Sequence, residues 1–244
     1  MAEKDILERH LEENDEVFAD LMNGLLFKGR QDVAADELET PPNSFLTSAD
    51  GIHTLPRAVV KFWQGVKFRI ACIGMGNEEK EGSPDPDLSV HVLRDDGLEY
   101  EAQLESRVFY PVITIVLYFN FEKAWSGPLS VKERMVESDD PFEPFVNDYG
   151  VNLYQIAELT SEQVKLFRSD FRDVADFFVQ TRQKGCCDPE DRELAHPQEV
   201  CQMLSDMTND PRFINAYSQK DPKGFPRTLK DVLARIKDGA RSEG

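Results

Sequence analysis

Four basic side chains follow one another along a short apolar stretch and could bind phosphate. The stretch reads RAVVKFWQGVKFRIACIGMGNEEK from position 57 to position 80, and its cations are Arg57, Lys61, Lys67 and Arg69. No acidic residue lies between Arg57 and Arg69, and aromatic residues are interleaved with the cations, as in many nucleic-acid-binding surfaces. The alternative is that lysines at strand ends and edges keep a sheet from aggregating. Both interpretations require this stretch to form strands.

The cysteines and histidines favour neither a metal site nor a nucleophile. The candidates for zinc are Cys186, Cys187, His196 and Cys201. Their spacing fits no zinc finger or ribbon, and adjacent cysteines are awkward chelators. His10, His53 and His91 stand in charged surroundings with no serine or cysteine partner that could make a catalytic pair. We therefore expect ordinary thiols, no disulfide framework, no bound metal and no cofactor.

Two strand-like segments must position the basic residues. AVVKFW at 58–63 and FRIACIGM at 68–75 are rich in β-branched and aromatic residues, and the intervening QG suits a tight connection between paired strands. YPVITIVLYFNF at 110–121 is a continuous apolar run, typical of a central strand that is covered on both faces. VNLYQIAEL at 151–159 predicts one more strand.

Helical spacing of apolar residues predicts the other elements. We expect one or two helices over 4–27 and a connector over 35–51. The segment 88–107 predicts a helix, whose apolar stripe consists of Leu88, Val92, Leu98 and Leu104. From Ser161 onward the pattern is helical, with a loose capping box from Ser161 to Val164.

The order of these elements predicts an α/β (α+β) fold, in which a mixed sheet is flanked by helices and followed by a helical C-terminal tail. We expect one domain over 1–184 and a helical extension over 185–244, with a soft boundary near Lys184 and Gly185.

Composition restricts the partners and the compartment. The chain has 244 residues, 40% of them hydrophobic and 30% charged, which is typical of a soluble globular protein. A formal net charge of −18 disfavours a nonspecific electrostatic grip on DNA, so any DNA binding must be local and weak, and a protein partner is the alternative. The charged N-terminus shows no secretory signal, and no apolar run is long enough to span a membrane, so we expect a cytoplasmic protein without a membrane partner.

An ordered set of landmarks carries a resemblance to a known family. The landmarks, in chain order, are DEVFADLMNGLLFKGRQ, RAVVK, IACIGMGNEE, FYPVITIVLYF, WSGP, FVNDYGVNLYQI, FRSDFRDVADFF and DGARSEG. Together they resemble the recombination-promoting nuclease and putative transposase family of the PD-(D/E)XK nuclease superfamily. The resemblance implies an αβββαβ restriction-endonuclease-like core and Mg²⁺-dependent cleavage of DNA. In that family one strand carries an Asp, and the next carries Glu-x-Gln.

The chain departs from this family pattern at the residues of the implied active site. The family's Asp falls on Ala58, its Glu on Gly76 and its Gln on Glu78, so both implied metal carboxylates are missing. Mg²⁺ needs anionic oxygen ligands, and its loss removes the charge stabilisation on which phosphoryl chemistry depends. A shifted alignment would instead bring a nearby acid into a ligand position: Glu78, Glu79, Asp85 or Asp87. Asp20 matches an acidic position on the family's first helix and could point into the same cleft, or it could be a solvated or helix-orienting Asp.

These observations leave three functional hypotheses. The first is a nuclease-family protein that no longer cleaves DNA and is retained for binding or regulation, or is decaying. The second is an active Mg²⁺-dependent DNA endonuclease of recombination that uses Glu78 and nearby acids, with Asp20 as a further catalytic candidate. The third is an acidic protein-interaction module that works through its surface and helical tail.

Overall fold

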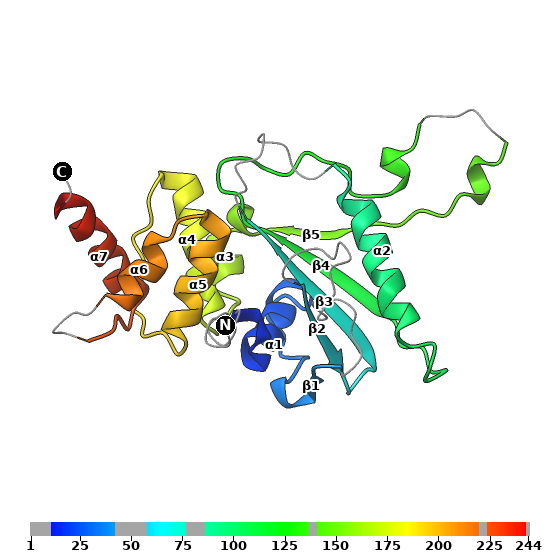
Figure 1. The fold of residues 1–244 in the computed structure, drawn as a ribbon, viewed down its shortest axis with the longest axis horizontal. Coiled ribbons are helices and arrows are strands. Elements are labelled where there is room, and N and C mark those ends of the chain that lie inside the picture. The colour runs from blue at the N-terminus through cyan, green and yellow to red at the C-terminus, as the bar shows by residue number, and fades with distance from the viewer. Residues whose placement is uncertain (1–10, 42–57, 77–85, 137–140, 220–223, 243–244) are drawn as a thin grey trace, which may run out of the picture.

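The computed structural model describes residues 11–41, 58–76, 86–136, 141–219 and 224–242. Within these residues the chain forms a five-stranded mixed sheet with helices on both faces (Figure 1). The strands are β1 (Leu38–Glu39), β2 (Ala58–Trp63), β3 (Phe68–Met75), β4 (Val112–Tyr118) and β5 (Asn152–Gln155). The helices are α1 (Asp15–Leu25), α2 (Leu88–Glu101), α3 (Ser161–Val164), α4 (Phe171–Lys184), α5 (Pro197–Thr208), α6 (Arg212–Ser218) and α7 (Leu229–Ser242).

The sheet confirms the predicted strand pair and its neighbour. The strands lie in chain order, β1 to β5. β2 is antiparallel to β1 and β3, whereas β3, β4 and β5 run parallel to one another. The parallel step from β3 to β4 crosses over through α2, as a parallel pair requires. The short strand β1 corrects the expectation that 35–51 is only a connector.

Alternate residues of the strands pack against different helices. On β3, Ile70 and Cys72 belong to the same buried cluster as Phe18 of α1, whereas Met75 packs against the cluster that contains Leu88 of α2. Because successive side chains of a strand point to opposite faces, α1 and α2 cover opposite faces of the sheet. The helix predicted within residues 4–27 therefore packs across one face of the sheet.

Capping residues define where several helices begin and end. The Asn14 side chain accepts hydrogen bonds from the backbone N–H groups of Glu16 and Val17 and so starts α1. The capping box of α3 consists of Thr160 and Gln163, one residue earlier than the sequence pattern predicts. Gly185, at φ 73°, ends α4, because glycine enters this left-handed region without a steric cost.

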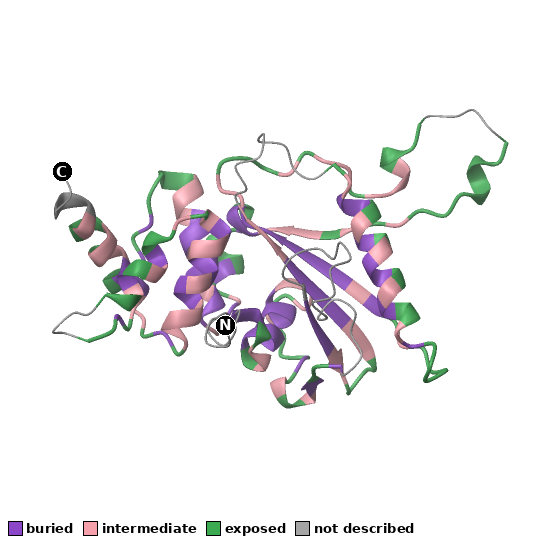
Figure 2. Ribbon diagram, in the orientation of Figure 1, coloured by how far each residue is buried: buried purple, intermediate pink, exposed green. Residues whose placement is uncertain are grey.

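One hydrophobic core connects the sheet with the C-terminal helices. Its buried residues run from Leu11 to Val232 and include phenylalanines of the predicted helical stripe: Phe167, Phe171, Phe177 and Phe178. Figure 2 shows buried residues along β3, β4, α1 and the inner side of α4. This core includes residues on both sides of Lys184 and Gly185, and the proposed domain boundary stays a prediction.

A long excursion leaves the sheet between β4 and β5. We call residues 129–150 the arm; its described parts are 129–136 and 141–150. Its base is closed by the bridge between Ser130 and Gly150 and by an ion pair of 2.7 Å between Arg134 and Asp87. The arm and α2 lie at one end of the molecule, and α5, α6 and α7 lie at the other (Figure 1). None of the described helices has the length and apolarity needed to span a bilayer.

Candidate functional site

The implied nuclease site falls where β2 begins and β3 ends. Ala58 is paired with Ile73, and Gly74 and Gly76 follow along the chain. Arg57 and Glu78 lie outside the described residues, as do Glu79 and Asp85. The fourth nearby acid, Asp87, is occupied by its ion pair with Arg134 at the base of the arm.

Helix α5 covers the end of β3. Gly74 and Gly76 are two residues apart and therefore point to the same face. A Cβ atom at Gly76 would lie 2.7 Å from the carbonyl oxygen of Met207 and 2.8 Å from its Cα, closer than real Cβ atoms approach. A Cβ atom at Gly74 would lie 3.4 Å from the Met207 thioether. The implied ligand position thus holds a close contact between backbone segments, which only glycine permits.

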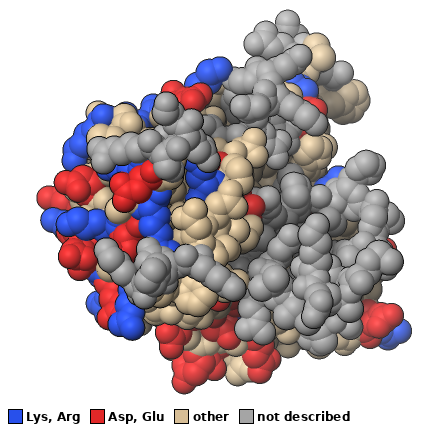
Figure 3. Space-filling model, turned by 60° about the vertical axis from the view of Figure 1, so that its left-hand side comes forward, with Lys and Arg blue, Asp and Glu red and all other residues tan. Residues whose placement is uncertain are grey.

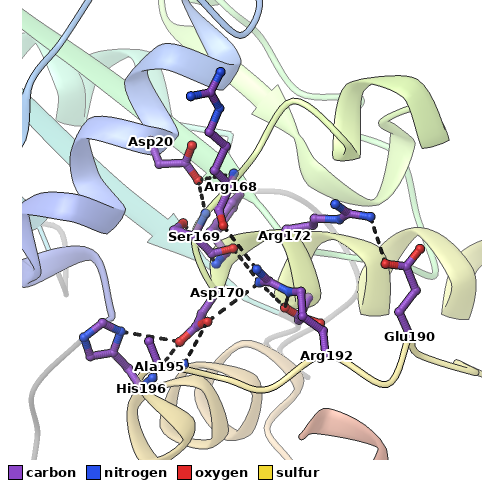
Figure 4. A network of polar contacts seen from close by, with 11 residues as sticks. Asp20, Arg168, Ser169, Asp170, Arg172, Glu190, Arg192, Ala195 and His196 are labelled. Atoms are coloured by element: carbon purple, nitrogen blue, oxygen red, sulfur yellow. Dashed lines mark hydrogen bonds and ion pairs between the residues drawn. The ribbon is translucent and has the colours of Figure 1, made fainter. Parts of the chain in front are cut away.

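Asp20 anchors the segment that leads into α4 (Figure 4). It is buried on α1, and its Oδ2 accepts hydrogen bonds of 2.8 Å from the backbone N–H groups of Arg168 and Ser169. Its Oδ1 is buried and has no hydrogen-bond partner among the described residues. The structure therefore gives Asp20 a positioning role between α1 and α4 and shows it to be desolvated.

Asp170 and Arg192 extend this network to the start of α5. Asp170 accepts hydrogen bonds from the backbone N–H groups of Ala195 (3.2 Å) and His196 (2.6 Å). Arg192 donates to the carbonyl oxygens of Arg168 and Ser169 and forms an ion pair with Asp173. Burial raises the pKa of Asp173, although Arg192 opposes this shift. These contacts fasten the segment before α5 to the beginning of α4.

His196 joins the beginnings of α1 and α5. Because the Asn14 oxygen caps α1, the Asn14 Nδ2 group must be the donor in its 3.0 Å contact with His196 Nε2. This assigns the proton of neutral His196 to Nδ1, which lies 3.4 Å from the Asp170 carboxylate. Nε2 therefore contacts Asn14, whereas Nδ1 is buried within ion-pair distance of Asp170 but makes no hydrogen bond among the described residues.

The cysteines near His196 are placed as ordinary thiols. Cys186 is exposed, whereas Cys187 and Cys201 are buried, and burial raises the pKa of each of these two thiols to about 12. Throughout the described ranges, no group of three or more His, Cys, Asp or Glu residues is arranged to hold a metal ion.

The structure separates the basic residues of the first stretch. Lys61 is buried, and its Nζ lies 2.7 Å from an Asp15 carboxylate oxygen. Arg69 lies 2.9 Å from the buried Glu99. Lys61 and Arg69 point to opposite faces, because Lys61 is paired with Ile70 in the register. Lys67 is exposed in the turn between β2 and β3 at φ 60°. These contacts do not favour a single phosphate-binding face.

At the end of the molecule formed by α5, α6 and α7, the surface charges also do not favour a phosphate-binding face. On the described part of the face in Figure 3, Lys and Arg side chains are interspersed with Asp and Glu side chains. Such mixing creates no extended positive field for a nucleic-acid backbone.

A buried group of carboxylates on α2 is the feature that sequence reasoning missed. Leu88 and Val92 are buried as predicted, but Leu98 is only partly buried and Leu104 is 58% exposed. The buried positions farther along the helix are polar: Asp95, Asp96, Glu99 and Gln103. The stripe predicted through Leu98 and Leu104 is therefore wrong. The available signal was spacing, because positions 88, 92, 95, 96, 99 and 103 share one helical face.

Each buried carboxylate of α2 has a hydrogen-bond or ion-pair partner. Asp96 accepts hydrogen bonds from the hydroxyl groups of Thr114 and Tyr149. Asp95 lies 2.6 Å from Arg94, and Glu99 is paired with Arg69. Burial raises the pKa of Asp96, with the nearby Asp95 and Glu99 carboxylates as smaller contributors, while the two hydroxyl groups oppose the shift. Burial also raises the pKa of Tyr149, which therefore stays protonated and donates.

Comparisons of the chain with protein-family models, with curated proteins and with solved structures find no significant match. A proposal for the function therefore rests on the contacts described above.

Proposed function

We propose that this chain is a nuclease-like protein of the recombination-promoting nuclease family that does not cleave DNA and acts by binding. The observation that carries this proposal is the contact of Gly76 with Met207. The residue at the implied Glu position has no side chain, and the backbone of α5 fills the space that a side chain would need.

The arrangement of the sheet supports the family part of the proposal. The resemblance implies an αβββαβ core, and the chain has α1, three strands, α2 and β4 in that order. The implied metal site would need side chains from two adjacent strands, and β2 and β3 are adjacent and antiparallel.

Chemistry supports the loss of cleavage. Mg²⁺ dehydrates reluctantly and is held by carboxylates at the sites where it assists phosphoryl transfer. The two implied ligand positions hold Ala58 and Gly76. The active-endonuclease hypothesis would have to find its ligands among acids such as Glu78, and restoring a carboxylate by Gly76→Glu would displace α5.

The test is a cleavage assay with the full chain and supercoiled plasmid or linear duplex DNA in Mg²⁺ or Mn²⁺. We expect no cleavage above that of a boiled sample, and no saturable heat of Mg²⁺ binding in calorimetry. The matched variants are Glu78→Ala at the implied site and Glu105→Ala at an exposed acid after α2. Cleavage that is lost on chelation and in Glu78→Ala, but kept in Glu105→Ala, would replace our proposal with the active endonuclease.

A further inference from the structure

The outer side of α2 carries an exposed apolar stripe. Its members are Val90, Leu93, Gly97, Tyr100 and, in the turn after the helix, Leu104. Their large side chains are between 38% and 58% exposed. The spacing of three, four, three and four residues is that of a helix seam that packs against another helix. We call these five residues the α2 stripe.

The α2 stripe reverses the usual arrangement of a surface helix. Such a helix turns its apolar side to the core and its charged side to water. Here Asp95, Asp96 and Glu99 face the sheet, while Val90 and Leu93 face outward; Tyr100 is 38% exposed, and its hydroxyl oxygen accepts a hydrogen bond from the backbone N–H of Val112. A row of large apolar side chains on the outside of a helix is a typical binding surface for another protein.

The α2 stripe is close to symmetric about its centre. Gly97 has no atom within 4 Å of a built Cβ, so its surface is open to a neighbour. Val90 and Leu93 lie on one side of Gly97, and Tyr100 and Leu104 lie at nearly the same spacing on the other. A two-fold axis through Gly97 would therefore place large side chains against large side chains and glycine against glycine, as a self-complementary contact requires.

The charges beside the α2 stripe favour an antiparallel partner of the same kind. Arg94 flanks its N-terminal half and Glu101 flanks its C-terminal half. Arg94 is paired with the buried Asp95, and the 35% of its side chain that stays exposed is the part that a second copy could contact. An antiparallel copy would bring Arg94 near Glu101 of the other chain, whereas a parallel copy would bring like charges together. We infer that the α2 stripe is the contact between two copies of this chain, with the two α2 helices antiparallel about Gly97.

The arm adds to the apolar surface at this end. Apart from Val66 and Phe225, every exposed large apolar side chain of the described residues lies on α2, on the loop after it or on the arm. Phe142 and Phe145 of the arm are 69% and 80% exposed. A stable dimer buries roughly 800 Å² per partner, more than one face of a helix about 21 Å long supplies. The exposed apolar side chains of the arm are a further surface at this end that such a contact would need beyond the α2 stripe.

Sedimentation equilibrium of the full chain over a range of concentrations tests the oligomeric state. We expect the mass of two chains for the wild type and for Val66→Glu, and the mass of one chain for Leu93→Glu. Val66 is the matched control, since it is 45% exposed and Leu93 is 40% exposed, but it lies in the turn between β2 and β3. Equal melting temperatures would show that both variants fold. A wild type that stays a single chain up to its solubility limit, or a Leu93→Glu variant that stays paired, would overturn the inference.

Oxidative cross-linking tests the antiparallel geometry in a Cys186→Ser background, which removes the exposed native thiol. Gly97→Cys should form a disulfide-linked dimer, since the two positions meet at the axis. Val90→Cys alone should not, because the two copies of position 90 are about 21 Å apart, beyond the Cα separation of a disulfide. The double variant Val90→Cys with Leu104→Cys should cross-link again. Efficient linkage through Val90→Cys alone, or none through Gly97→Cys, would contradict this pairing. The result does not depend on whether the chain cleaves DNA.

Discussion

The two faces of the sheet are covered by helices of different character. On one face, α1 packs through Phe18, Leu21 and Met22, and its buried Asp20 and Asn23 bond to backbone groups of neighbouring segments. On the other face, α2 buries Asp96 and Glu99, whose partners are side chains. A polar group that bonds to backbone keeps its partner under most substitutions. A carboxylate whose partners are side chains can lose one of them through a single mutation.

The largest expected effect comes from removing such a partner. Arg69→Met should lower the free energy of unfolding by about 3–5 kcal/mol, because it deprives a fully buried Glu99 of its arginine. Lys61→Met on the other face should cost less, because the Asp15 side chain is 45% exposed and water can solvate it. Urea unfolding of both variants measures the two losses in the free energy of unfolding. The double variant Arg69→Met with Glu99→Leu should recover most of the loss, and equal costs for the two single variants would contradict the difference between the faces.

A smaller difference in stability is expected between alanine variants of two glycines, Gly76 and Gly97. Gly76→Ala should lower the free energy of unfolding by about 1–3 kcal/mol, because its Cβ meets the backbone of Met207 and α5 must shift. Gly97→Ala on the outer side of α2, made in the Leu93→Glu background so that no contact between copies is altered, should instead stabilise the chain by up to about 1 kcal/mol, since a helix favours alanine. Both variants add one methyl group, so thermal unfolding at one protein concentration compares them directly. If both variants were stabilised, or both destabilised, the close contact with Met207 would not be the reason for glycine at position 76.

The smallest expected effect is a pH dependence of the free energy of unfolding, and it arises from Asp96 on the face of the sheet that α2 covers. Because burial raises the pKa of Asp96 in the folded state, the folded chain holds this proton more tightly than the unfolded chain. The stabilisation is complete below the unfolded pKa of about 3.9 and is lost as the pH rises through the raised folded value. Relative to Asp96→Asn, the wild type should therefore lose stability with rising pH, by at most about 1.4 kcal/mol per pH unit within that window.

Urea unfolding of the wild type and Asp96→Asn at several pH values from acid to neutral measures this difference. Parallel pH profiles would mean that Asp96 is not desolvated as its burial indicates. Tyr149→Phe serves as a second variant: it removes a donor to the carboxylate and should extend the window to higher pH.

The strands are the best-predicted part of the fold, and the physical reason is their composition. β2, β3 and β4 are apolar runs rich in β-branched residues, and such residues fit the pleated, buried surface of a strand. The capping residue of α3 was misplaced by one position because Thr160 and Ser161 are both good N-caps.

The candidate site was less predictable than the fold. The orientation of α2 could not be read from residue types, because carboxylates usually face water, and side chains such as Arg69, Thr114 and Tyr149 make their burial tolerable. The contact of Gly76 with Met207 joins residues far apart in the chain, and nothing local to either residue predicts it. The sequence could therefore show that Gly76 has no side chain, but not that the backbone of α5 fills the space beside it.

The hydrogen bond between Asn14 and His196 has a consequence for synthesis of the chain. The two residues are 182 positions apart, and the backbone donors to Asp20 are 148 and 149 positions away. In contrast, each strand of the sheet lies beside the next strand in the sequence, so the sheet can grow as the chain is made. Helix α1 leaves the ribosome early but meets its last partners only after the start of α5 has been synthesised. Its contacts with the segments before α4 and α5 are thus among the last to form as the chain is made.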